Sequence, residues 1–487
     1  MKSFKDFIHY ISFKEQKTEL CVLILLISII GVLFYNLYPF PFVFPDTGAY
    51  ILSAQSGILN IYRPMGYSYY LQFLHSINSS FSFIFIASYF FNALISLFFL
   101  YSFKYLIELK NKWIFYGLCL FVFLSPTILF STNFLMSDGL FNTLTILFMA
   151  TALWMVYSSN IWIIIIHLCC LAMLYNVRYA GMFYVPVSMI VLFLAFQKKA
   201  IILRIIIACI PIALLLFLQN STRAEYKKVT GVNTTSGFGG WQLMNNASVL
   251  IPKAKQLPVT KFDTELEQLY HKFLISCPDS IFTTQAALST GLMWDQTSPF
   301  KQFVFYYMQM TNRPYPIAWV EAGELYSKYA QKLIFTYPFD FITSFIIPSF
   351  TGFFEFREIG EHGGEFKNEK MYQDYYNIQI DNYKHTCNLF SDINPARHIL
   401  HYIYWIIFAA ASIYFFVTTR KSSFADKYWQ TSGLLLSFII IYIGISALAS
   451  PNTTWRYTMP IYIPSILFIG SILNELLIKT SLKNKIK

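Results

Sequence analysis

A single carboxylate follows the first long apolar run of the chain, Asp46 in the segment Phe44-Pro45-Asp46-Thr47-Gly48-Ala49-Tyr50. A carboxylate at a membrane surface can act as a general base toward a hydroxyl group, or can hold a metal ion. The same residue can also simply begin a helix, because Asp is a preferred N-cap residue. The segment therefore predicts either a reactive group or a helix start.

A second carboxylate, Asp138, stands in front of another apolar run, in Met136-Ser137-Asp138-Gly139-Leu140. A Ser-Asp pair in this position is typical of a helix N-terminus. Together with Asp46, it could supply oxygen ligands to Mg²⁺ or Mn²⁺. Two carboxylates are too few to define such a site, so the sequence leaves the metal open.

Three arginines accompany these carboxylates: Arg63, Arg178 and Arg456. They lie on short connections that carry no other basic residue, whereas the alternate connections are rich in lysine. A guanidinium group offers a rigid fork to phosphate oxygens and keeps its charge, so we expect these residues to bind a phosphate. The alternative is that each side chain reaches the lipid headgroups.

The elements that must position these residues are membrane helices. Hydrophobic residues make up 56% of the 487 residues and charged residues only 13%, well below the roughly 25% charged of an average soluble domain. The sequence predicts an all-α polytopic membrane protein with about ten transmembrane helices. The apolar runs are 19–38, 81–106, 113–131, 138–157, 161–175, 181–197, 201–219, 399–419, 430–449 and 458–478.

The net charge of +11 follows from the predicted topology. Cytoplasmic segments are enriched in Lys and Arg because these charges resist translocation. We therefore expect both termini in the cytoplasm, Asp46 on the extracytoplasmic face, and a multi-pass protein of the cytoplasmic (inner) membrane. No nucleic-acid partner is expected. The basic segments are 2–17, 104–112, 198–204, 420–427 and 479–487.

The chain divides into three parts. Residues 1–219 form an N-terminal module of about seven membrane helices, residues 220–398 a large extracytoplasmic loop region, and residues 399–487 a C-terminal module of three helices. Cys277 and Cys387 are the two cysteines of the loop region, and they could pair in an oxidising compartment.

Several segments of the loop region have recognisable patterns. Residues 263–275 and 321–337 carry apolar stripes at helical spacing and predict helices. Residues 339–354 are apolar but too short for a span, which favours an interfacial or re-entrant segment. The glycine-rich stretch 231–240 predicts a flexible connection.

These motifs resemble the GT-C superfamily, the integral-membrane glycosyltransferases that use polyprenyl-phosphate-linked sugars, including the protein O-mannosyltransferase and aminoarabinose-transferase branches. The plan of seven spans, a large loop and three spans fits the same superfamily. The likeness depends on Asp46 with Tyr50, the segment Arg63 to Tyr67, Asp138 at the start of the fourth span, and Trp455 to Pro460 before the last span.

The resemblance implies a GT-C-like fold and an inverting transfer of a sugar from a polyprenyl-phosphate donor to an acceptor hydroxyl at the extracytoplasmic face. The donor sugar stays open, as does the acceptor, which can be a glycan, a lipid or a protein. The membrane lipid itself is the other partner. The resemblance implies that Asp46 and Asp138 are the catalytic residues, with Asp46 as general base and Asp138 as a second carboxylate that helps hold the acceptor or a divalent cation. It also implies that the donor phosphate is bound by Arg456, Arg178 and less strongly Arg63, and that the sugar or acceptor is contacted by Tyr50, Tyr67 and Trp455.

One departure and two alternatives remain. Many members of the superfamily have Asp-Glu at the first site, whereas Thr47 follows Asp46 here, so the need for a divalent cation stays open. An O-antigen polymerase or ligase also works at this face with outer arginines. A lipid-linked sugar flippase or transporter would place ionisable residues deep within its spans, and the spans of this chain carry almost none.

Overall fold

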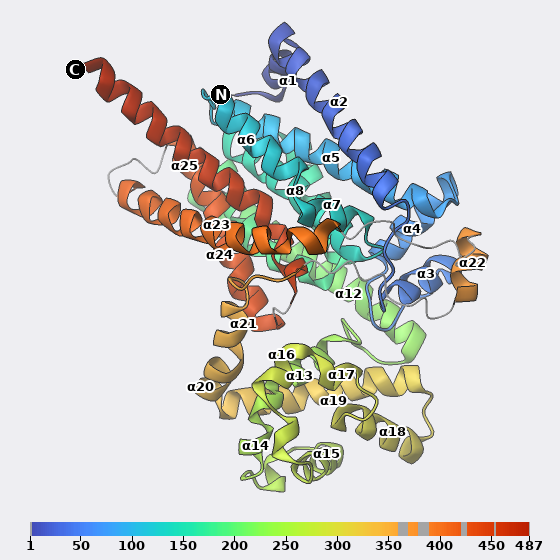
Figure 1. The fold of residues 1–487 in the computed structure, drawn as a ribbon. Helices are drawn as coiled ribbons and strands as arrows, with labels where there is room; N and C mark the ends of the chain where they lie inside the picture. The colour runs from blue at the N-terminus through green and yellow to red at the C-terminus, as the bar shows by residue number, and fades with distance from the viewer. Residues whose placement is uncertain (1, 359–368, 378–388, 420–425, 452–453, 487) are drawn as a thin grey trace.

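The structure, a computed structural model, describes residues 2–358, 369–377, 389–419, 426–451 and 454–486. In these ranges it is helical, and its only β-type pairing is an isolated bridge between Phe42 and Phe134. Figure 1 shows a bundle of long helices that carries both termini at one end and a smaller helical domain at the other. The all-α prediction is confirmed.

Eight helices among the described residues are long and apolar enough to cross a membrane, which confirms a multi-pass protein. Two shorter apolar helical segments, Ile161–Val177 (α9) and Tyr179–Ala195 (η1 and α10), add to them. The eight are α2 (Lys14–Leu37), α5 (Phe81–Leu106), α6 and α7 (Lys112–Asn133), α8 (Ser137–Tyr157), α11 and α12 (Ile201–Thr230), α23 (Leu389–Thr419), α24 (Lys427–Ala449) and α25 (Met459–Ile486).

Helix α8 forms the centre of the bundle. It packs against α5, α9, α10, α24 and α25 and is almost wholly buried. Its sequence is apolar on all sides, which is the pattern of a fully buried helix. Thr143 and Thr145 satisfy their hydroxyl groups by donating to the carbonyl oxygens one turn earlier, Gly139 and Phe141. By contrast, α2, α23 and the α11–α12 pair expose most of their apolar surface, as expected of helices that face lipid.

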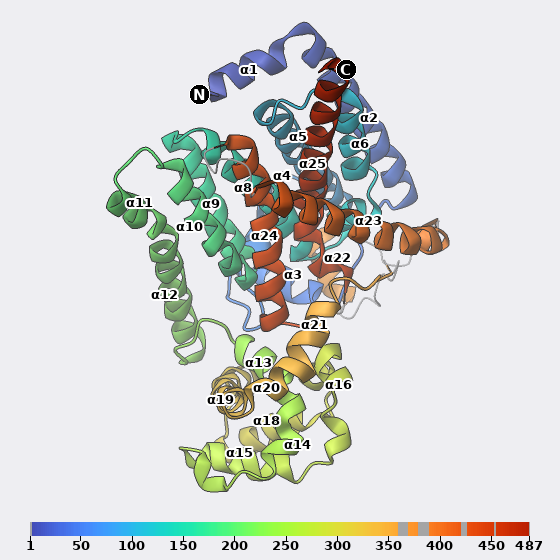
Figure 2. The same cartoon turned by 90° about the vertical axis from the view of Figure 1, so that its left-hand side faces the viewer.

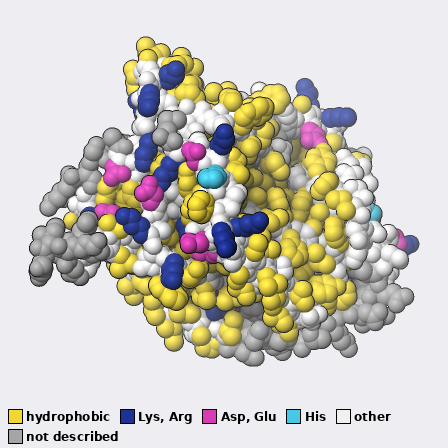
Figure 3. Space-filling model, turned by 90° about the horizontal axis from the view of Figure 1, so that it is seen from above, with side chains coloured by type: hydrophobic (Ala, Val, Ile, Leu, Met, Phe, Trp, Pro, Cys, Tyr) yellow, Lys and Arg dark blue, Asp and Glu magenta, His cyan; other side chains and the backbone are white. Residues whose placement is uncertain are grey.

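The described basic residues of these connections lie at the end of the bundle that carries the termini (Figure 3). Lys2 forms a 3.0 Å ion pair with Glu108. Lys427 donates to the carbonyl oxygen of Val156, one residue before the end of α8. Asp138 lies in the first turn of α8 and therefore at the opposite end of the same helix. The structure therefore confirms that the described basic connections and Asp138 lie at opposite ends of the bundle.

The smaller domain has its own hydrophobic core and runs from α13 (Gly239–Ala247) to α19 (Tyr315–Thr336). The rings of Trp241 and Trp319 stack at a centroid distance of 3.6 Å where these two helices cross. The predicted helix at 263–275 is α15 (Glu265–Ile275). Helix α19 begins at Tyr315, earlier than predicted. Helix α12 continues to Thr230, past the expected module boundary at 219, and leads from the bundle into this domain (Figure 2).

The glycine-rich stretch 231–240 is closely packed at two of its glycines, and its flexibility stays a prediction. A Cβ atom added to Gly240 would lie 1.8 Å from the carbonyl oxygen of Gly323, and one added to Gly237 would lie 2.5 Å from the carbonyl oxygen of Ile61. At Gly240 only a glycine fits, because α13 crosses α19 in backbone contact there.

The segment after α19 turns back to the bundle. Pro338–Thr351 makes an angle of 104° with α19, as a broken span or a re-entrant loop would. Figures 1 and 2 show its helices α20 (Pro338–Phe341) and α21 (Ile347–Thr351) rising from the small domain toward the bundle. Cys387 lies outside the described residues, so the suggested pair with Cys277 stays a prediction.

Candidate functional site

The first connection between helices is fastened to the start of α8. The N–H of Phe42 donates to the carbonyl of Asn133 at 2.8 Å, and the N–H of Leu135 donates to the carbonyl of Phe42 at 2.9 Å. The hydroxyl of Thr47, which is completely buried, donates to the carbonyl of Leu135 at 2.9 Å. These bonds hold the segment around Asp46 beside the segment around Asp138, although the two are far apart in sequence.

Asp46 precedes helix α3 (Thr47–Ser56), but its side chain makes no capping hydrogen bond. Instead, both carboxylate oxygens accept from Nη2 of Arg63, at 2.9 and 2.8 Å. The Arg63 guanidinium also lies 5.0 Å from the ring centroid of Phe238, the residue directly before α13 of the small domain. Burial alone would lower the pKa of Arg63, but the Asp46 carboxylate outweighs it and the pKa is raised. The helix-start interpretation therefore does not account for the Asp46 side chain.

Asp138 is a buried counter-ion shared by two arginines. Its side chain is only 3% exposed and forms an ion pair with Arg178, while Nη1 of Arg456 lies 3.5 Å from its second oxygen. The N-cap of α8 is Met136, so Asp138 lies inside the first turn and does not cap the helix. Two guanidinium groups on one carboxylate leave an excess of positive charge in this cluster.

The three aromatic residues that were expected to contact the sugar or acceptor lie in the interior of the bundle. The hydroxyl of Tyr50 donates to Ser137 at 3.0 Å, and the ring of Tyr67 packs edge-on against Tyr50 at 4.9 Å. Trp455 packs against the ring of Phe134 at 5.4 Å. All three are buried in the core of the bundle, and none of them is among the residues that line the cavity beside Asp46.

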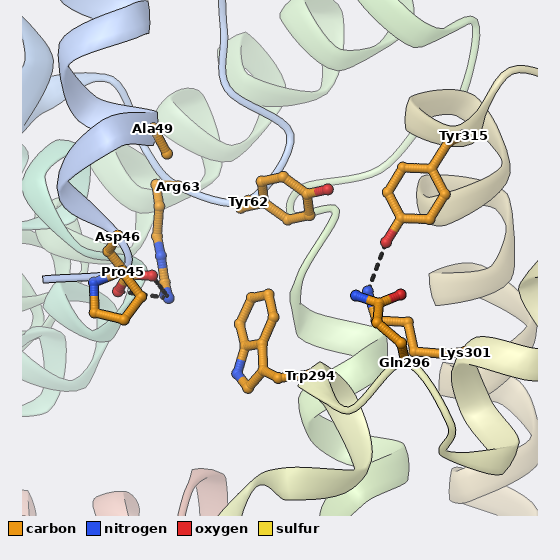
Figure 4. A pocket seen from close by; sticks show the side chains of 9 residues that line it. All are labelled: Pro45, Asp46, Ala49, Tyr62, Arg63, Trp294, Gln296, Lys301 and Tyr315. Carbon is orange, nitrogen blue, oxygen red and sulfur yellow. Dashed lines mark hydrogen bonds and ion pairs between the residues drawn. The ribbon is translucent and has the colours of Figure 1, made fainter. Parts of the chain in front are cut away.

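That cavity has a volume of about 480 Å³ and lies between the bundle and the small domain (Figure 4). Asp46 is the only acidic residue among the described residues that line it. The small domain closes the other side with residues that sequence reasoning missed. The lining residues are Pro45, Asp46, Ala49, Tyr62, Arg63, Trp294, Gln296, Lys301 and Tyr315.

Lys301 is the least expected of these residues. Only 3% of it is exposed, and its Nζ donates to the hydroxyl of Tyr315 at 2.5 Å. Burial lowers the pKa of Lys301 to about 8, and burial likewise raises the pKa of Tyr315. A lysine in the apolar start of α18 (Pro299–Thr311) was the one available sequence sign of it.

The side chains that the structure describes do not form a binding site for a divalent cation. Both oxygens of Asp46 face Arg63, and the oxygens of Asp138 face Arg178 and Arg456. No group of three or more His, Cys, Asp or Glu side chains converges in the part of the chain that the structure describes. The Mg²⁺ or Mn²⁺ that the sequence left open has no ligand set here.

No protein-family model matches this chain, and no curated protein matches it. The GT-C superfamily therefore stays a resemblance of motifs, and the functional argument depends on the geometry of the site.

Proposed function

We propose that this protein is a membrane glycosyltransferase that moves a sugar from a polyprenyl-phosphate donor to an acceptor hydroxyl bound in the cavity beside Asp46. The observation that supports this most strongly is that one carboxylate faces a cavity walled by the rings of Tyr62, Trp294 and Tyr315. Saccharides bind well to such surfaces, because their apolar C–H faces cover aromatic rings while hydroxyl groups meet a few polar side chains.

Asp46 is the proposed general base. Each of its oxygens accepts one hydrogen bond from Arg63 and keeps a further lone pair for an acceptor hydroxyl. Asp46 takes the hydroxyl proton as the hydroxyl oxygen bonds to the anomeric carbon of the donor sugar. The bond from that carbon to the phosphate oxygen breaks, and polyprenyl phosphate leaves with the bonding electrons. A single displacement inverts the anomeric carbon, and a positioned base of this kind contributes about 10²- to 10⁴-fold.

Arg178 and Arg456 are the proposed partners of the donor phosphate. They share the one carboxylate of Asp138, so their cluster retains positive charge with which to meet the charge that develops on the leaving phosphate. Asp138 is then a positioning residue that orients both guanidinium groups. This assignment differs from the acceptor- or metal-binding role that the resemblance implied for it.

The position of the charges favours this function over transport. The charged residues of the site lie around the start of α8, at the end of the bundle opposite the basic connections, whereas a transport path usually places ionisable groups at mid-membrane. These residues are Asp46, Arg63, Asp138, Arg178 and Arg456. The proposed site accordingly faces away from the cytoplasm, by the distribution of Lys and Arg.

The test is transfer of radiolabelled sugar from a panel of polyprenyl-phosphate sugars to membrane extracts, with and without EDTA. We expect transfer by the wild type and by Asp263→Asn, a control at an exposed carboxylate of the small domain, and no transfer by Asp46→Asn. EDTA should leave the rate unchanged. Failure to consume any donor, or full transfer by Asp46→Asn, would overturn the proposal.

A further inference from the structure

Lys301 is a buried cation surrounded by aromatic rings. Its Nζ lies 4.1 Å from the ring centroid of Trp319, 5.3 Å from Tyr315, 5.4 Å from Trp241 and 5.9 Å from Trp294. Across the ranges that the structure describes, Lys301 forms no ion pair with a carboxylate. The hydrogen bond of its Nζ, among the described residues, goes to the neutral hydroxyl of Tyr315.

Such a position is costly for a lysine. Burying a charged ammonium group without a paired anion is strongly unfavourable, and cation–π contacts offset only part of that cost. A purely structural role would be met as well by Met, which fills a similar volume without charge. Buried groups that line a cavity and have strongly shifted pKa values are candidates for functional residues. We therefore expect the charge of Lys301 to bind a ligand.

The cavity has two chemically different ends. Figure 4 shows Asp46 and Arg63 on one side and Lys301, Gln296 and Tyr315 on the other, with the rings of Tyr62 and Trp294 between them. An acceptor in this cavity would present a hydroxyl group to Asp46 at one end. At the other end it meets an ammonium group and an amide, which suit a negatively charged substituent.

We propose that Lys301 binds the carboxylate or phosphate group of an anionic saccharide, whose ring lies between Tyr62 and Trp294. The identification of this saccharide as the acceptor depends on the proposed function. The binding of the saccharide to Lys301 does not depend on it. A neutral saccharide would leave the ammonium group of Lys301 unpaired, so the cavity selects the anionic one.

The pH dependence follows from the groups that face Lys301. These are the hydroxyl of Tyr315 on α19, the Gln296 amide, and the Asp46–Arg63 pair across the cavity. With a pKa of about 8, Lys301 is charged below pH 8 and loses its proton as the pH rises through that value. At pH 9.5 roughly 3% of the protein keeps the charge, so the affinity for a carboxylate should fall about 30-fold from its value at pH 6.5.

The experiment is isothermal titration calorimetry on the full chain in detergent micelles. The probes are one disaccharide with a terminal uronic acid, the same disaccharide with a terminal phosphate, and the neutral parent. We expect an anionic disaccharide to bind more tightly than the parent, and the uronic acid and phosphate arms identify which anion is preferred. Lys301→Met, which keeps the apolar stem, should weaken that binding about 10- to 100-fold, and Lys301→Arg should retain most of it.

The controls separate this inference from the proposed function. Lys253→Met, at an exposed lysine of the same domain, should bind like the wild type. The titrations contain no sugar donor, so they report binding whether or not the protein transfers a sugar. The pH series uses only the wild-type protein, so its result does not depend on whether a variant folds. Equal binding of the anionic and neutral disaccharides, no binding of either anionic one, an unchanged affinity in Lys301→Met, or a flat pH series would overturn the assignment.

Discussion

Replacing Asp138 with Asn should destabilise the membrane bundle. Its carboxylate is 3% exposed and is the shared counter-ion of Arg178 and Arg456. Removing one partner of a buried ion pair costs about 3–5 kcal/mol, because the remaining charge is left uncompensated. The two arginine side chains are 26% and 27% exposed, so water screens part of that cost. We therefore expect the free energy of unfolding to fall by about 3 kcal/mol, the lower end of the range.

The assay is equilibrium unfolding of the purified protein in mixed micelles with increasing SDS, for wild type and Asp138→Asn. A double-mutant cycle with Arg178→Gln isolates the pair, and its coupling energy should be about 1–3 kcal/mol. Asp263→Asn, at a 79% exposed carboxylate, is the control and should change stability by less than about 0.5 kcal/mol.

Two results would refute this reasoning. Wild-type stability in Asp138→Asn would show that the carboxylate is not the counter-ion that the geometry indicates. Wild-type stability together with lost transfer would make Asp138 a catalytic residue, as the resemblance to the GT-C superfamily implied.

Three further predictions concern the cavity and the small domain. Arg63→Met should slow transfer about 10- to 100-fold because Asp46 loses the group that orients it, and Arg63→Lys should restore part of the rate; equal rates in both variants would exclude a role for the charge. Trp294→Ala should raise the KM for acceptor about five- to tenfold with little change in kcat, and a fall in kcat alone would contradict its place in the acceptor wall. Gly240→Ala should expose the small domain to limited proteolysis, because the new Cβ would lie 1.8 Å from the Gly323 carbonyl, whereas Gly117→Ala meets nothing within 4 Å and should digest like the wild type.

The long helices were predictable because the bilayer imposes their length on the sequence. Apolar runs such as 81–106 and 138–157 match α5 and α8 almost to the residue. The apolar stripe predicts this helix only from Glu321, whereas α19 begins at Tyr315. Pro316, in its first turn, is a start signal that points to the earlier residue.

The pairing of charges within the site was not predictable from local pattern. The sequence predicts Asp46, Arg63 and Asp138 at one face, but the pairing of Asp138 with Arg178 and Arg456 brings together three segments that are far apart in sequence. Such contacts join distant segments, and neither segment carries a sequence pattern that predicts them.

The second wall of the cavity was missed for a similar reason. Trp294, Lys301 and Tyr315 belong to a domain whose position against the bundle depends on tertiary contacts such as that of Arg63 with Phe238. The composition of residues 231–240 was equally uninformative, since glycines serve both flexible chains and close helix crossings. Only the partner, Gly323, distinguishes the two.

The central claim is that Asp46 takes the proton of the acceptor hydroxyl. The most direct measurement is the single-turnover rate of sugar transfer by Asp46→Asn at saturating donor and acceptor, compared with the wild type. We predict a fall of about 10²- to 10⁴-fold with unchanged donor binding. A rate equal to that of the wild type, in a variant that folds and binds donor, would contradict the account.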